Sequence, residues 1–302
     1  MAGKYIFSNL IGCFVFDEEF KVVEKSKDEK SIVKKYSDAE IINKDSKNLN
    51  KALDFFKDKK YFSEFYEKNL LLTKRALKEA VNDDLLIVQT VSNIEELDRT
   101  ANTLIKRLRE WYELYNPEFS KSVSNNESFV KLILEKDKEQ LLKELKLKKE
   151  DSMGADFKAE DLKPIMELAE RVSELYVLRS SQEEYLKKLM QRYCPNLTAI
   201  VGHMIGAKLL LQAGSLKHLV GFPASTIQLL GAEKALFRHL RTGAKSPKHG
   251  VIIQHPLVAK AKNKGKAARV LADKIGIAVK VDYFKGEFIG DKLKKDVEDK
   301  LK

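Results

Sequence analysis

Residues 94–115 read IEELDRTANTLIKRLREWYELY, and apolar side chains return in this stretch at alternating intervals of three and four residues. The series is Ile94, Leu97, Ala101, Leu104, Leu108, Trp111 and Tyr115. Such spacing is typical of a coiled-coil seam rather than of a short helix in a compact core. A following Asn-Pro pair ends the pattern, because proline disfavours helical geometry in the residue before it. The stretch therefore predicts one long helix that needs a partner.

A second series with the same spacing predicts that partner. It runs through Ile165, Leu168, Val172, Leu175, Arg179, Gln182, Leu186, Leu189 and Tyr193. Two such helices, each of roughly thirty residues and roughly 45–50 Å, favour a long antiparallel coiled-coil hairpin over residues 83–194. On spacing alone, packing of both helices on an ordinary bundle core is an equal alternative. Polar seam residues, Arg179 and Gln182, favour a specified partner, and residues 120–156 predict a polar, partly helical tip.

The residues before the hairpin, 1–82, predict a small α+β domain. Ile11 to Phe16 and Phe20 to Val23 are short apolar stretches separated by acidic residues, as in a β-hairpin, and Glu40 to Asn43 is a further candidate strand. Two amphipathic helical patterns follow within residues 49–81. We expect these helices to cover one side of the sheet.

The last third of the chain is strongly basic. Residues 185–272 contain fifteen lysines and arginines but a single acidic residue, Glu233, whereas the chain-wide frequency of 45 in 302 predicts about 13 acidic residues in that window. Residues 195–302 carry 20 basic and 8 acidic side chains and all five histidines. Such depletion of carboxylates indicates contact with the phosphates of a nucleic acid. The sequence therefore predicts a mainly α fold that ends in a basic, all-α domain.

One predicted helix of this domain, beginning near residue 232, is amphipathic. Its cationic face is formed by Lys234, Arg238 and Arg241, and Ala232, Leu236 and Leu240 line a face that we expect to pack. Gly231 leaves backbone amides free at the helix start to meet a phosphate or a partner backbone. Glu233 has two possible roles, which the sequence leaves open. It either complements the helix dipole or accepts hydrogen bonds from a nucleobase edge or a basic partner.

Nothing in the sequence predicts a catalytic or metal site, or a cofactor. The histidines form no ligand-spaced cluster with acidic residues, and Gly-rich dinucleotide and Walker loops are absent from the sequence. The two cysteines, Cys13 and Cys194, make neither a disulfide framework nor a paired zinc motif, which suits a reducing compartment. There is no secretory signal pattern, and the apolar run over residues 198–211 is too short to span a bilayer. We expect a cytoplasmic protein without a membrane partner.

Three segments of the basic third resemble the Nop domain. They are AGSL (213–216), PASTIQLLGAEKALFR (223–238) with its GAEK signature, and PKHG (247–250). The resemblance covers about residues 196–284 and extends in kind to the hairpin through LREWY (108–112) and NPE (116–118). It points to the archaeal Nop proteins of box C/D small ribonucleoproteins. The short charged tail, without long charged repeats, favours an archaeal role over a nucleolar one.

The resemblance implies a non-catalytic scaffold for RNA-guided 2′-O-methylation. The N-terminal domain would hold the methyltransferase fibrillarin, and S-adenosylmethionine would bind to fibrillarin alone. The hairpin would form a homodimer, and the Nop domain (195–302) would bind box C/D guide RNA together with a kink-turn-binding ribosomal-protein homologue. The alternative is a spliceosomal-type Nop-domain RNA-binding protein that works without fibrillarin. At Lys280, relatives often have arginine, which can form a bidentate phosphate contact.

Two sets of candidate residues follow from the charge pattern, the seam and the resemblance. The residues expected to meet RNA or the kink-turn protein are Gln228, Gly231, Ala232, Glu233, Lys234, Arg238, Arg241, Lys245, Lys248, His249, Lys266 and Arg269. The residues expected to pair two copies are Leu97, Leu104, Leu108, Trp111, Val172, Leu175 and Leu186.

Overall fold

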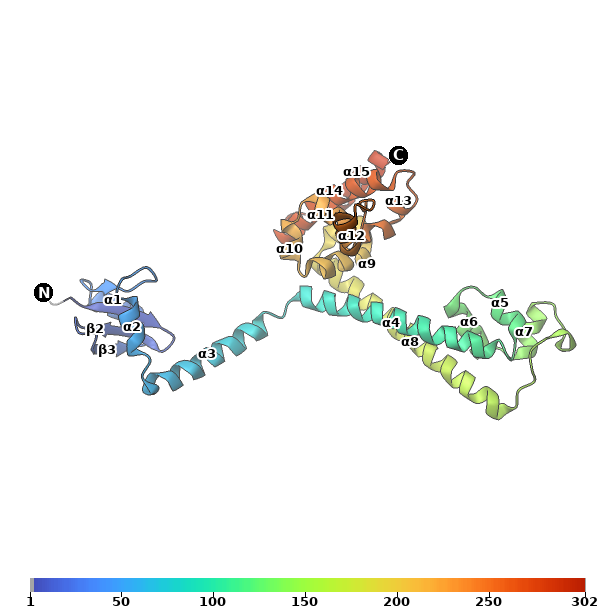
Figure 1. The fold of residues 1–302 in the computed structure, drawn as a ribbon, viewed down its shortest axis with the longest axis horizontal. Coiled ribbons are helices and arrows are strands. Elements are labelled where there is room, and N and C mark those ends of the chain that lie inside the picture. The colour runs from blue at the N-terminus through green and yellow to red at the C-terminus, as the bar shows by residue number, and fades with distance from the viewer. Residues whose placement is uncertain (1–2, 302) are drawn as a thin grey trace. The chain divides into compact units, whose positions relative to one another are not determined.

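The computed structural model describes residues 3–301 and separates into two compact units, Met1–Val81 and Asn82–Lys302 (Figure 1). The first unit contains a four-stranded sheet with helices, and the second is helical. The predicted fold class, mainly α with a small α+β N-terminal domain, is confirmed. The hairpin and the basic domain belong together to the second unit.

The sheet of the first unit has the strand order β3-β2-β1-β4. Its elements are β1 (Tyr5–Asn9), β2 (Gly12–Phe16), β3 (Val22–Ser26), α1 (Glu29–Lys35), β4 (Glu40–Ile41), α2 (Leu49–Phe55) and α3 (Lys59–Glu79). β2 pairs antiparallel with both β1 and β3, and β4 joins β1 in parallel. The hairpin and the further strand expected from the sequence are therefore present, and β1 is an additional strand that the sequence analysis missed.

Both faces of this sheet are covered by helices. Val15 packs with Ile32 of α1 on one face, and Phe14 packs on the other face with Phe56, which follows α2. β2 is apolar at consecutive positions because its side chains alternate between two buried faces. The segment from α2 to the start of α3 covers one side of the sheet, as expected, and α1, which the sequence pattern did not indicate, covers the other.

α3 begins against the sheet but buries none of its residues. Near its start, Lys25 forms an ion pair with Glu64 at 3.1 Å, and the Lys68 ammonium donates to the Ile11 carbonyl at 3.3 Å. The large apolar side chains along the helix, among them Phe62, Tyr66, Leu70 and Leu77, are exposed. Within the residues that the structure describes, the apolar face of α3 is therefore uncovered.

Two long helices, α4 (Asp83–Tyr112) and α8 (Ala159–Tyr193), run antiparallel in the second unit (Figure 1). The Arg192 guanidinium lies 2.6 Å from the Asp83 carboxylate, and that of Arg179 lies 2.8 Å from Asp98. Residue numbers thus rise along α4 while they fall along α8. The predicted antiparallel hairpin is confirmed.

Each end of the hairpin is buried in a separate apolar core. Near the basic domain, Ile94 and Leu186 belong to a large cluster that includes side chains of that domain. At the opposite end, Leu108 and Val172 belong to a cluster formed with the hairpin tip. The hairpin is therefore held at both ends by globular packing as well as by contact between its two helices.

The tip is a small helical cap with its own core. It contains α5 (Pro117–Ser122), α6 (Asn126–Glu135), α7 (Lys138–Glu144) and the 3-10 turn η1 (Lys149–Asp151). The Arg109 guanidinium donates to the Asn126 side chain at 2.9 Å and to the carbonyls of Ser120 and Val123 at 2.8 and 2.7 Å, and it lies 4.2 Å from the centre of the Phe129 ring. One arginine of α4 therefore organises the cap. The tip was expected to be polar and partly helical, and its apolar core is the additional finding.

The basic domain is made of two long helices and several shorter ones. They are α9 (Pro195–Ala213), α10 (Leu216–Gly221), α11 (Ala224–Leu229), α12 (Glu233–Thr242), η2 (Val251–Gln254), α13 (Pro256–Ala259), α14 (Lys264–Tyr283) and α15 (Gly290–Leu301). α14 buries Ala267, Leu271, Ile275 and Ala278, which share one face of the helix. In residues 3–301, we find no helix with the length and apolar character needed to cross a membrane.

α9 is broken at Gly202, where φ is 79° and ψ is 164°. A side chain there would meet open space, so this glycine serves backbone conformation. At Gly206, in contrast, an added Cβ would lie 2.7 Å from the Met190 methyl group of α8. Of the two glycines, it is Gly206 that allows α9 to approach the hairpin closely.

Buried carboxylates hold the starts of two helices in this domain. Asp282, on α14, accepts hydrogen bonds from the Asn196 amide (3.0 Å), the Asn196 side chain (2.8 Å) and the Leu197 amide (2.9 Å) at the start of α9. Asp84, on α4, accepts the Leu216 amide of α10 at 3.0 Å. Asp282 replaces a local cap, which α9 lacks, whereas Asp84 adds to the Ser215 cap of α10, because the first amides of a helix have no partner within it.

Candidate nucleic-acid interface

The basic loop between α12 and η2 is held against the end of α11. The Gly250 amide donates to the Gln228 carbonyl at 2.8 Å, and the Val251 amide donates to the Leu230 carbonyl at 2.7 Å. The side-chain amide of Gln228 also donates to the Lys248 carbonyl at 2.6 Å. Gln228 therefore positions the loop.

Two glycines make this close approach possible. A Cβ on Gly250 would lie 1.9 Å from the Leu230 carbonyl oxygen, which is shorter than any real contact. Gly231 has φ of +83°, and a Cβ there would lie 2.5 Å from a methyl group of Val251. Glycine is needed at both positions because the two backbones nearly touch. Gly231 was expected to expose backbone amides, and no pattern in the sequence singles out Gly250.

The predicted cations of this region are exposed and unneutralised. They are Lys234, Arg238 and Arg241 on α12, Lys245 and Lys248 in the loop, and Lys266 and Arg269 on α14. Within residues 3–301, none of these seven side chains forms an ion pair with a carboxylate. A Cβ on Gly265 would lie 3.4 Å from the Lys248 side chain, so the loop and the start of α14 are adjacent. The result is a cationic surface that the chain itself leaves unpaired.

The other face of α12 is not packed as expected. Ala232 and Leu236 are half-buried, but Leu240 is 70% exposed and Phe237 is 64% exposed. α12 buries none of its residues. The expectation that Leu240 packs inward is wrong, because α12 lies on the surface with Leu240 largely in solvent.

Glu233 has a local structural role. Ala232 occupies the cap position of α12 and has no side-chain acceptor, and the Glu233 carboxylate reaches back to accept the Gly231 amide at 2.7 Å. One oxygen, Oε1, makes this bond, and the side chain remains exposed. Glu233 thus lies in the first turn of α12 and binds the residue before the helix cap, and its second oxygen has no donor within residues 3–301.

The histidines of this domain do not converge on one site. His239 contacts the Ala244 carbonyl, where the loop leaves α12, and His249 is half-buried within the loop. In buried His255, Nδ1 accepts the Leu257 amide at 3.3 Å, so Nε2 donates to the Ile200 carbonyl at 3.2 Å, and burial lowers the pKa of this imidazole. The described part of the chain contains no group of three or more His, Cys, Asp or Glu side chains placed to hold a metal ion.

Residues 93–302 match the model of a protein family, Nop, described as "snoRNA binding domain, fibrillarin". The chain belongs to the Nop family. Its resemblance to that family, drawn from the GAEK segment, is therefore confirmed, and the match also includes most of the hairpin.

The Nop chain is similar to proteins of archaea and eukaryotes. It is 40% identical over 266 residues to an uncharacterized NOP5 family protein of Methanocaldococcus jannaschii, which covers 81% of this chain and 63% of that one. It is 44% identical over 215 residues to nucleolar protein 58 of Schizosaccharomyces pombe, which covers 66% and 42%. The chain thus spans less than two thirds of the length of these curated relatives. A chain in a crystal structure of a fibrillarin/Nop5p complex is 24% identical, with a TM-score of 0.48 and coverage of 98% of this chain and 100% of that one.

In this Nop chain, the hairpin seam is shifted from the predicted one. The buried line along α4 includes Ile105 and Tyr112, each next to a residue of the predicted seam. Of the seven residues expected to pair two copies, Leu108, Val172 and Leu186 are buried inside the chain, Leu97, Leu104 and Leu175 are half-buried, and Trp111 is 41% exposed. The chain's own packing uses some of these side chains and leaves Trp111 in particular available.

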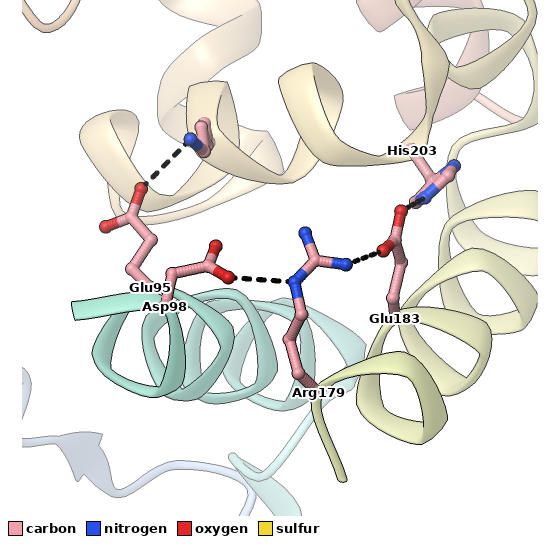
Figure 2. Close-up of polar contacts among 6 residues, drawn as sticks. Glu95, Asp98, Arg179, Glu183 and His203 are labelled. Atoms are coloured by element: carbon pink, nitrogen blue, oxygen red, sulfur yellow. Dashed lines mark hydrogen bonds and ion pairs between the residues drawn. The ribbon is translucent and has the colours of Figure 1, made fainter. Parts of the chain in front are cut away.

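A polar network joins the hairpin of the Nop chain to α9 (Figure 2). Arg179, predicted at a seam position, lies between Asp98 of α4 and Glu183 of its own helix, and Glu183 accepts His203 of α9 at 3.1 Å. Partial burial raises the pKa of Glu183, but hydrogen bonds from His203 and Arg179 outweigh it and hold that pKa below its usual range. Polar contacts thus take the place of apolar ones in the middle of the seam, between Arg179 and Asp98.

Proposed function

We propose that this Nop-family chain is a scaffold subunit of a box C/D-type ribonucleoprotein that directs 2′-O-methylation of RNA. The observation that carries the proposal is the exposed cationic surface of α12, the following loop and α14, whose seven side chains find no carboxylate partner within residues 3–301. Unpaired cations on a folded surface attract phosphate and release its counterions. Membership of a family described as snoRNA binding supports RNA as the polyanion.

The proposal assigns a different partner to each part of the chain. The N-terminal unit holds fibrillarin, which binds S-adenosylmethionine and performs the methyl transfer. The uncovered apolar face of α3 supports docking of a protein there. The hairpin pairs two copies, supported by the exposed Trp111, and the basic domain binds guide RNA together with a kink-turn-binding protein. This chain carries no catalytic residue in the scheme.

Removing single charges from α12 tests the RNA surface. We expect Lys234→Gln or Arg238→Gln to weaken binding of a box C/D guide RNA about tenfold, the effect of losing one charge-assisted contact of about 1.5 kcal/mol. The slope of log affinity against log salt concentration should become shallower by about one per lost phosphate contact. Fluorescence anisotropy over a salt series measures both quantities.

Arg107→Gln is the matched control for this test, because Arg107 is exposed but forms an ion pair with Glu110 at 2.7 Å on the hairpin. Its affinity and salt slope should equal those of the unmodified chain. Unchanged slopes for both α12 variants would show that this surface does not contact RNA.

Reconstitution tests the whole assembly. The full chain, fibrillarin, a kink-turn-binding protein and a box C/D RNA should form one particle containing two copies of the chain, as measured by analytical ultracentrifugation. Addition of S-adenosylmethionine should give 2′-O-methylation of the guided target only when fibrillarin is present. Methyl transfer without fibrillarin contradicts the scaffold proposal. RNA binding without capture of fibrillarin favours the spliceosomal-type alternative instead.

A further inference from the structure

A cavity of about 240 Å³ lies between α11 and α12, beside the cationic surface. It is lined by Ser225, Thr226, Leu229, Leu230, Glu233 and Leu236. It is smaller than the roughly 300–1,000 Å³ pockets that hold drug-sized ligands. Its volume suits a small ring system rather than an extended molecule.

The lining combines an apolar floor with unused polar groups. Leucine side chains of both helices provide the floor, and the hydroxyl groups of Ser225 and Thr226 have no hydrogen-bond partner within residues 3–301. Glu233 accepts the Gly231 amide through Oε1, and Oε2 has no donor within the same residues. The cavity therefore presents hydrogen-bond acceptors above a surface on which an aromatic ring can lie.

The face of α12 beside the cavity also combines apolar and polar side chains. Glu233, Leu236, Phe237 and Leu240 are spaced at i, i+3, i+4 and i+7 and therefore share one side of the helix. Phe237 and Leu240 are exposed there, and the cations of α12 occupy the adjoining side. An aromatic ring for stacking, a carboxylate acceptor and unpaired cations thus lie together, as recognition of one nucleotide requires.

We propose that this cavity binds an unpaired guanine of the RNA and that Glu233 reads its Watson-Crick edge. Guanine is the RNA base with two adjacent donors, N1–H and the 2-amino group, which match the two oxygens of a carboxylate. Uracil, cytosine and adenine each place an acceptor next to their donor, which a carboxylate repels. Phe237 stacks on the exposed part of the base, and Lys234 and Arg241 meet the flanking phosphates. The inference deepens the proposed function and rests on it.

The charge distribution favours a nucleotide over a protein segment. Glu233 is the one acidic residue between residues 185 and 272. An apolar protein segment seated on this face would bury Oε2 of that carboxylate without a donor, at a cost of about 1–3 kcal/mol or more. A guanine supplies two donors to the same carboxylate, so its burial is compensated.

The test uses the full chain and four RNA heptamers that differ at one base, UUUXUUU with X as G, A, C or U, measured by fluorescence anisotropy. We expect the G heptamer to bind about 5-fold to 100-fold more tightly than the U heptamer, the range for one bidentate base contact. Glu233→Gln keeps an oxygen to accept the Gly231 amide but loses the paired acceptors. It should remove the preference for G while binding of the U heptamer is retained.

Two further variants separate this inference from the proposed function. Arg238→Gln should weaken all four heptamers alike, because it removes a phosphate contact, and Phe237→Ala should weaken all four without changing the salt slope, because it removes stacking. Equal binding of the four heptamers, absence of binding to any of them, or a G preference that survives in Glu233→Gln overturns the guanine site. The proposed function still stands in each of these outcomes if binding of guide RNA depends on Arg238. The occupant of this face of α12 is then a protein partner.

Discussion

Replacing Asp282 with alanine should lower the free energy of unfolding of the helical unit by about 3–5 kcal/mol. The substitution leaves three buried N–H donors of Asn196 and Leu197 without an acceptor. Each unsatisfied donor costs about 1–3 kcal/mol, and the costs are not fully additive. Burial raises the pKa of Asp282, while the hydrogen bonds from Leu197 and Asn196 act in the opposite direction. Because three donors bind it, this carboxyl group is part of the structure that holds the beginning of α9.

The chain offers a convenient probe for this measurement. Trp111 is its single tryptophan and lies on α4, so urea denaturation followed by tryptophan fluorescence reports on the helical unit and not on the N-terminal one. Asp273→Ala is the matched control, because Asp273 lies on the same helix and is exposed. Its effect should stay within about 0.5 kcal/mol. Equal stabilities for the two variants would show that the capping contacts contribute little.

Replacing Gly250 with alanine should weaken guide-RNA binding by about 10-fold to 100-fold. A Cβ at this position meets the Leu230 carbonyl oxygen at 1.9 Å, so the loop must move away from α11 and lose its backbone hydrogen bonds. Lys245, Lys248 and His249 move with it. The loss of one or two charge-assisted contacts of about 1.5 kcal/mol each gives the expected range.

Gly221→Ala is the control for this variant. Gly221 ends α10, and an added Cβ there meets no atom within 4 Å. Its RNA affinity should equal that of the unmodified chain, and tryptophan fluorescence should show that both variants are folded. Undiminished RNA binding by Gly250→Ala would mean that the loop does not contribute to the interface.

Spacing along the chain was sufficient to predict the long helices, but not which of their faces meet. A repeat of three and four residues is compatible with two neighbouring lines, one through Leu104 and Trp111 and the other through Ile105 and Tyr112. The structure buries the second line. The choice depends on the shape of the partner helix and of the tip, which a one-dimensional pattern does not contain.

The same distinction applies to the candidate interface. The acid-poor segment and the periodicity of α12 correctly indicated a cationic helix, because charge and spacing are properties of the sequence itself. The same pattern wrongly predicted that Leu240 is buried. Amphipathicity shows that a helix has an apolar face but not that another element lies against it.

By itself, the sequence determined the order and type of the main elements, the location of the positive charge and membership of the Nop family. Only the tertiary structure decided that Gly250 must be glycine, that Asp282 caps α9 and that a cavity lies beside Glu233. These features join residues that are distant along the chain, such as Asp282 and Asn196, 86 positions apart. Hydrogen bonds and steric contacts act over a few ångströms in space, and folding alone determines which distant residues come within that range.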